Sequence, residues 1–133
     1  MKKPAIAILA LAALALTAPS LFADESQTLT GQFIWERSDK NIDGDLRAVF
    51  EPTGESAWNV SFYFKFEEKD HIYSGTAEGS LTDGTLKGKV MSDGDKPRPF
   101  EFEGTFADGS FQGTHTGFRK GEPSPTGTMT LSR

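Results

Sequence analysis

Apolar and polar residues alternate along most of the chain after about residue 24. The clearest case is the stretch 57–67, where Trp58, Val60, Phe62, Phe64 and Phe66 share one side and mostly polar residues take the other. Alternation with a period of two predicts a β-strand with one buried face. The pattern recurs in seven further stretches: 29–36, 45–52, 71–81, 85–91, 99–106, 110–117 and 126–132.

Short turn signals separate these stretches. Asp83-Gly84 and Asp108-Gly109 are typical of two-residue hairpin turns, because aspartate and glycine tolerate positive φ. Short links make successive strands antiparallel neighbours, so the sequence predicts a meander. An internal repeat relates 78–88 to 103–113. Its register predicts facing pairs: Leu81–Leu86 and Gly79–Gly88 in the first copy, Phe106–Phe111 and Gly104–Gly113 in the second.

The eight strands carry one apolar face, and no helical pattern supplies a cover for it. We therefore predict an all-β fold in which the meander closes into a small barrel, with a two-sheet sandwich as the alternative. The expected inward residues are Phe33, Trp35, Leu46, Ala48, Phe50, Trp58, Val60, Phe62, Phe64, Phe66, Tyr73, Ala77, Leu81, Leu86, Val90, Phe100, Phe102, Phe106, Phe111, His115, Met129 and Leu131. The inward glycines are expected to leave gaps between the rings: Gly75, Gly79, Gly88, Gly104 and Gly113.

Residues 1–23 have the order of a secretory signal peptide. Two lysines precede an apolar run from Ala5 to Leu16, and a proline and a small residue follow before the acidic Asp24-Glu25. The apolar run is shorter than a membrane-spanning helix requires. We therefore expect a signal-peptide helix over 1–23, one barrel domain over 24–133, and export to the periplasm or beyond.

Composition narrows the partners. Cysteine is absent, so no disulfide can support the fold. The formal net charge is −5, and it becomes −7 when Lys2 and Lys3 leave with the signal peptide. A domain this acidic is a poor candidate for binding nucleic acid or anionic lipid. Outward residues such as Lys87 and Glu101 also argue against a barrel that spans a membrane after signal cleavage.

The predicted layout resembles the calycin-like barrels, which include lipocalins, avidins and fatty-acid-binding proteins. The resemblance covers most of the chain after the signal peptide and concerns architecture. Lipocalins carry a Gly-x-Trp motif on the first strand, and the corresponding stretch is Gly31-Gln32-Phe33-Ile34-Trp35, with the tryptophan two residues later. The resemblance implies that a small apolar molecule binds inside the barrel.

The inner face also supplies candidate ligand contacts. His115 and Tyr73 would place two polar groups among aromatic rings, an arrangement that orients a guest in an apolar pocket. The expected ligand-binding residues are Trp35, Trp58, Phe62, Tyr73, Phe102 and His115. His71 is expected in a solvent-facing turn. No serine, cysteine or second histidine is placed to complete a catalytic triad or a zinc site, so we expect no enzymatic activity.

The segment 39–45 resembles the first half of a calcium loop. Asp39, Asn41, Asp43 and Asp45 stand at alternate positions with Gly44 before the last of them. The position of the closing bidentate glutamate is occupied by Phe50, so an EF-hand is excluded. A calcium-stabilised hairpin and a solvated acidic turn both stay open, and no other cofactor is expected.

Two functions are compatible with these patterns. The first is an exported, non-enzymatic binding protein that holds a small apolar or aromatic ligand in a barrel lined by Phe and Trp. The second is an interaction module with a filled core, such as an inhibitor of a secreted hydrolase or an envelope accessory protein. That module would contact a protein partner through the predicted loops 37–45 and 118–125.

Overall fold

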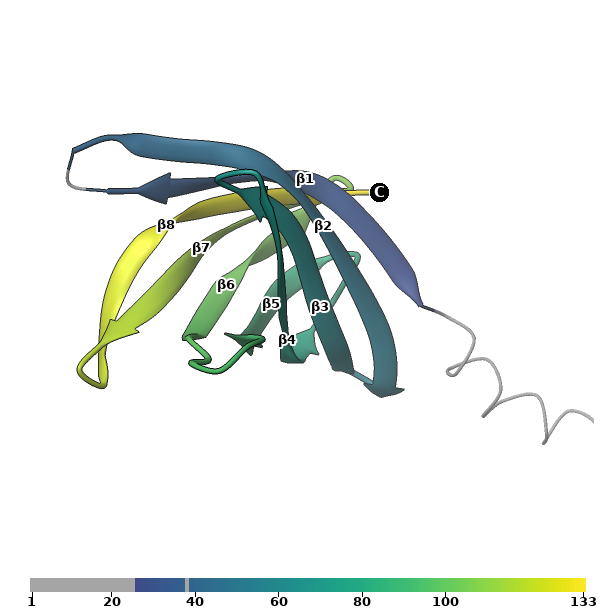
Figure 1. Ribbon diagram of the computed structural model, residues 1–133. Helices are drawn as coiled ribbons and strands as arrows, with labels where there is room; N and C mark the ends of the chain where they lie inside the picture. The colour runs from purple at the N-terminus through teal and green to yellow at the C-terminus, as the bar shows by residue number, and fades with distance from the viewer. Residues whose placement is uncertain (1–25, 38) are drawn as a thin grey trace, which may run out of the picture.

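Eight antiparallel strands close into a barrel in the computed structural model, which describes residues 26–37 and 39–133 (Figure 1). The strands are β1 (Gln27–Glu36), β2 (Asn41–Gly54), β3 (Ala57–Phe66), β4 (Lys69–Gly79), β5 (Gly84–Ser92), β6 (Pro99–Ala107), β7 (Ser110–Arg119) and β8 (Glu122–Ser132). Each strand pairs with the next, and β8 pairs with β1. The predicted closed meander is confirmed, and the sandwich alternative is wrong.

The predicted signal peptide, residues 1–23, lies outside the described residues. Across the part of the chain that the structure describes, none of the elements is a helix with the length and apolar character needed to cross a membrane.

Closure of the barrel depends on the seam between β1 and β8. The seam runs from the pair Thr30–Ser132 to the pair Trp35–Gly127. It removes both sheet edges and encloses the apolar face of every strand. The enclosed core contains sixteen buried apolar side chains, and fifteen of them belong to the predicted inward set. Leu29, on the same face of β1, is the addition.

The two ends of the barrel differ. One end, which we call the mouth, carries the turns 37–40, 67–68 and 120–121 and the loop 93–98. The opposite, closed end carries the connections 55–56, 80–83 and 108–109 and both ends of the described chain. Arg133 fastens the closed end, because its guanidinium donates hydrogen bonds to the Leu81 carbonyl (2.8 Å) and to the Gln27 side chain.

The expectation that inward glycines leave gaps is wrong. Neighbouring aromatic rings fill the space at Gly88, Gly104 and Gly113, and backbone atoms of β5 fill it at Gly75 and Gly79. The Phe111 ring lies over both Gly104 and Gly113, where the ring Cζ is 2.7 Å and 2.6 Å from the place that a Cβ would take. The Phe102 ring covers Gly88 in the same way. Bare glycine lets the strand coil while an aromatic ring from nearby completes the core. The closed half of the barrel is therefore packed.

The first copy of the repeat does not have the predicted register. Gly79 pairs with Leu86, and Ala77 pairs with Gly88, whereas in the second copy the predicted pairs are confirmed. The cause is a wider turn at 80–83, in which the Ser80 hydroxyl accepts hydrogen bonds from the Thr82 and Asp83 amides at 3.1 Å and 3.0 Å. Leu81 leaves the strand but stays buried at the closed end.

Both predicted contact loops are shorter than expected. Residues 41–45 belong to β2, where they pair with β1, and only residues 37–40 connect the two strands. Residues 118–125 are mostly paired between β7 and β8, around a turn at Lys120-Gly121. Pro123 and Pro125 had suggested a loop. They lie on a stretch of β8 that has no β1 partner, and proline is tolerated on such an edge.

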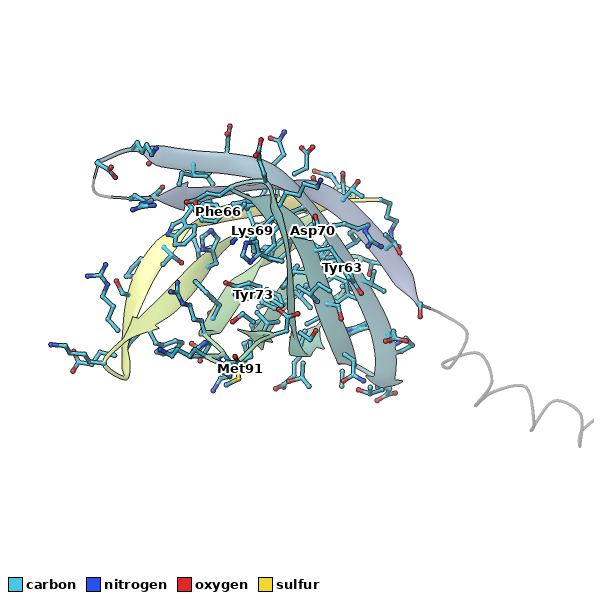
Figure 2. The ribbon with its side chains drawn as sticks, viewed as in Figure 1. Tyr63, Phe66, Lys69, Asp70, Tyr73 and Met91 are labelled. Carbon is cyan, nitrogen blue, oxygen red and sulfur yellow. The ribbon has the colours of Figure 1, made fainter. Side chains whose placement is uncertain are left out.

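The outer wall is largely polar, with a few exposed apolar side chains. Met91 is the most exposed of the large ones (Figure 2), ahead of Ile34 and Ile72. The Arg47 guanidinium lies 4.1 Å from the centre of the Tyr63 ring, a cation–π contact between neighbouring strands.

Candidate functional site

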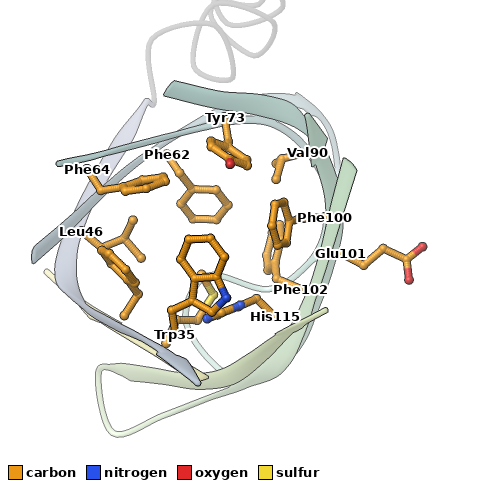
Figure 3. Close-up of a pocket in the computed structure, with 12 residues that line it drawn as sticks. Trp35, Leu46, Phe62, Phe64, Tyr73, Val90, Phe100, Glu101, Phe102 and His115 are labelled. Carbon is orange, nitrogen blue, oxygen red and sulfur yellow. The ribbon is translucent and has the colours of Figure 1, made fainter. Parts of the chain in front are cut away.

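An apolar pocket lies in the half of the barrel nearest the mouth (Figure 3). Its volume is about 80 Å³. Residues from all eight strands line it: Phe33, Trp35, Leu46, Phe62, Phe64, Tyr73, Val90, Phe100, Glu101, Phe102, His115 and Met129. Glu101 contributes no charge to the interior, because its side chain points out of the barrel (Figure 3) toward Lys89 Nζ at 3.4 Å.

The size of the pocket limits its guest. An engineered protein cavity of about 150 Å³ binds benzene, and sites for drug-sized ligands have about 300–1,000 Å³. A volume of about 80 Å³ therefore suits one small group, with the rest of a larger molecule left in the mouth. Below the pocket, Phe50, Phe106 and Phe111 are almost wholly buried and close the floor.

Five of the six predicted ligand-binding residues meet in this pocket: Trp35, Phe62, Tyr73, Phe102 and His115. Trp58 does not. It lies toward the closed end, where it packs edge-on against Phe50 at 6.4 Å, and its Nε1–H donates to the Gly79 carbonyl at 3.0 Å. The structure thus gives the two tryptophans different roles: Trp35 lines the pocket and Trp58 anchors the β4–β5 turn.

His115 is a wall residue whose ring nitrogens already have partners. Nε2 lies 3.0 Å from the Ile34 carbonyl on β1, and Nδ1 lies 2.6 Å from the Thr126 hydroxyl on β8. The ring reaches β1 by passing over Gly127, where a side chain would meet Nε2 at 2.9 Å. Burial lowers the pKa of His115, while the Ile34 carbonyl, the Glu36 charge and the Thr128 backbone oppose that change.

Two polar atoms of the pocket wall make no hydrogen bond within residues 26–37 and 39–133: the Tyr73 hydroxyl and the Trp35 indole N–H. Burial raises the pKa of Tyr73, with Arg98 lowering it and Asp93 raising it by their charges. The phenol therefore stays protonated at neutral pH and can donate a hydrogen bond. The surface of the pocket itself is almost wholly apolar, so these two donors are available only to a part of a guest that extends beyond the pocket.

Aromatic side chains that the sequence analysis left out of the site extend the pocket toward the mouth. Phe66 lies 5.2 Å from Trp35, and His71 stacks on Phe64 with ring centres 5.4 Å apart and an interplanar angle of 15°. The expected solvent-facing position of His71 is therefore wrong. The turn is confined to residues 67–68, so β4 begins at Lys69 and the alternation that turns Tyr73 inward also turns His71 inward.

The candidate calcium ligands do not form a loop. Asp39 lies in the turn, and Asn41, Asp43 and Asp45 take exposed alternate positions on β2. Alternate residues of a strand are about 7 Å apart, so an ion bound by one cannot be encircled by the others. Among the described residues there is no cluster of three His, Cys, Asp or Glu side chains that could hold a metal ion.

Comparison with known proteins gives no relative: no family model, no curated protein and no solved structure matches this chain. The features that bear on function are therefore those of the structure itself: a small β-barrel with an aromatic cluster at its mouth.

Proposed function

We propose that this protein is an exported, non-enzymatic binding protein that holds a small, uncharged apolar or aromatic group in its mouth pocket. The observation that carries the proposal is the lining, in which seven aromatic side chains surround a cavity and no charged side chain points into it. Apolar surface of this kind binds a guest through burial and dispersion, while a few polar atoms set its orientation.

The pocket also indicates what the guest carries. The Tyr73 hydroxyl and the Trp35 indole N–H offer donors without a partner among the described residues, and the ring nitrogens of His115 are occupied. A guest with a hydroxyl, ether or carbonyl oxygen beside its ring or alkyl end satisfies these donors at little cost in desolvation. Benzyl alcohol has this chemistry and makes a suitable probe; because its ring needs more than the volume of the pocket, it would occupy the pocket together with the mouth above it.

Tryptophan fluorescence tests the proposal. In the variant Trp58→Phe, Trp35 is the only tryptophan left, so its emission reports on the pocket. We expect benzyl alcohol to change this emission saturably. A second substitution, Val90→Phe, fills the pocket and should weaken binding at least tenfold, whereas Ile72→Phe on the outer wall should leave it unchanged. A barrel that gives no saturable change, or equal binding by the Val90→Phe protein, would contradict the proposal.

The packed floor favours a second candidate function. A barrel with little internal space can act through its rim, as an inhibitor of a secreted hydrolase does, and the turns 37–40 and 120–121 both lie at the mouth. Replacement of Arg119 and Lys120 by serine should then abolish capture of the protein partner from the culture fluid without changing benzyl alcohol binding. If the Val90→Phe protein loses probe binding but still captures the protein partner, the pocket is dispensable for this second function.

The proposal includes two further points: that the protein is exported, and that its barrel resembles the calycin-like barrels in architecture. The signal-like order of residues 1–23 supports secretion, and the eight-stranded meander supports an architecture-level likeness to small secreted barrels. Sequencing the N-terminus of the protein recovered from the periplasm or the medium tests export. A protein that keeps Met1 and stays in the cytoplasm contradicts it.

A further inference from the structure

His115 joins three strands at the seam of the barrel. Its own strand is β7, its Nε2 contacts the Ile34 carbonyl of β1, and its Nδ1 contacts the Thr126 hydroxyl of β8. The same hydroxyl lies 2.9 Å from the His115 carbonyl, to which it can donate. These three contacts share a limited number of protons.

The protonation state of the ring decides how the protons are distributed. The Ile34 carbonyl only accepts, so Nε2 must carry a proton, and in the neutral ring Nδ1 is then an acceptor. The Thr126 hydroxyl has one proton, which it can give to Nδ1 or to the His115 carbonyl, but not to both. When Nδ1 is also protonated, it donates to Thr126, and the hydroxyl turns to the carbonyl. The site thus holds either form of the ring without moving the backbone.

The two forms differ in what they present to the pocket. His115 lines the cavity, with the Phe100 ring 6.4 Å away. A neutral ring is an ordinary part of an apolar wall. A charged ring is tolerated only while water in the mouth still solvates it, and an apolar guest in the pocket displaces that water.

We propose that protonation of His115 weakens the hold of the pocket on an apolar guest, so that the barrel binds near neutral pH and releases in acid. This inference rests on the proposed function. By linkage, a guest that makes protonation of His115 tenfold less favourable binds the protonated barrel about tenfold more weakly.

Few other charges face the ring. From β1, Glu36 attracts the proton. From β6, Glu101 points outward to Lys89, and from β8 the neighbours Thr126, Gly127 and Thr128 are uncharged. Across the pocket, β4 presents Tyr73 and His71. The chain has two histidines, so His71→Gln serves as the control for an effect of the other imidazole.

The test measures benzyl alcohol affinity at about pH 7.5 and about pH 5 in three proteins. We expect affinity to fall severalfold at about pH 5 for the wild type and for His71→Gln, approaching about tenfold only when the ring is fully protonated, and to be independent of pH for His115→Gln, in which an uncharged amide replaces the ring. As an independent readout, the NMR titration midpoint of the His115 ring in the His71→Gln protein should move to lower pH when the probe is added.

The outcomes separate this inference from the proposed function. Three results would overturn the inference and leave the proposed function standing. The wild type could bind the probe equally tightly at both pH values, His115→Gln could lose as much affinity in acid as the wild type does, or the titration midpoint of His115 could stay the same when the probe is added. Absence of probe binding at every pH overturns both.

Discussion

Gly44→Ala probes how closely the aromatic rings fit the barrel wall. Gly44 lies on β2, and a methyl group at this position would lie 2.8 Å from Cε1 and 3.0 Å from Cζ of Phe33. The next atom is the Lys65 carbonyl oxygen at 3.7 Å, an ordinary contact. The Phe33 ring is therefore the sole close obstacle, and Phe33 also lines the pocket.

The expected magnitude follows from two opposing effects. Carbon atoms in contact are ordinarily about 3.5–4.0 Å apart, so the ring must move by about 0.5–1 Å, and overpacking of this kind costs about 1–3 kcal/mol. Replacing glycine by alanine in a strand returns about 0.5–1 kcal/mol of backbone entropy. We expect a net loss of about 1 kcal/mol in the free energy of unfolding, and weaker probe binding because the displaced ring enters the pocket.

A double-mutant cycle isolates the contact. In a Phe33→Leu background the obstacle is gone, so Gly44→Ala should become neutral or stabilising, and the coupling energy should be about 1–3 kcal/mol. Urea unfolding followed by tryptophan fluorescence measures each corner of the cycle at constant m-value. Gly117→Ala is a graded control, because its methyl would meet Phe100 and Thr126 at the milder distances of 3.1 Å and 3.2 Å. Additive effects of the two substitutions would refute the reasoning.

Further predictions concern single interactions, all measured by urea unfolding. Trp58→Phe should cost about 1 kcal/mol, because the Gly79 carbonyl loses its indole donor; an unchanged midpoint contradicts this. Thr126→Val should cost about 1 kcal/mol by removing the hydroxyl that serves His115, and Thr126→Ser should restore most of it. Glu68→Gly should stabilise by about 1 kcal/mol, since Glu68 has a φ of 65° that glycine adopts without strain. Because the pKa of His115 is depressed on folding, the unfolded chain binds the proton more readily, so stability should fall as the pH drops below 6.5 in the wild type and fall less in His115→Gln.

The sequence predicted the wall of the barrel better than its turns. Strict alternation identifies the inward face, because a strand has only two faces and one of them is apolar in every segment. Asp108-Gly109 gave the correct register, but the same signal at Asp83-Gly84 failed where the Ser80 hydroxyl held a wider turn. The 67–68 turn was hidden because Glu67 and Glu68 adopt positive φ without glycine or asparagine to signal it.

The pocket itself could be predicted only in part. Trp35 and Trp58 are equivalent in the pattern, since both are inward aromatic residues on strands. Their different depths follow from the place of each residue along its strand: β1 and β3 run in the same direction, and Trp35 lies near the mouth end of β1 whereas Trp58 lies near the closed end of β3. Whether an inward ring fills a space or borders one depends on side-chain rotamers and on the glycines nearby, such as Gly104 beneath Phe111. The alternation of apolar and polar residues carries no information about side-chain rotamers or about which ring covers which glycine.

The placement of the chain ends has a practical consequence. Residue 26 and Arg133 both lie opposite the mouth, and Arg133 is tied to the Leu81 carbonyl. A tether joined through a flexible spacer after Arg133 would therefore hold the barrel on a sensor chip with its opening toward the bulk liquid. Immobilised in this orientation, the barrel can be exposed to successive solutes or acid washes while its point of attachment stays remote from the rings that receive them.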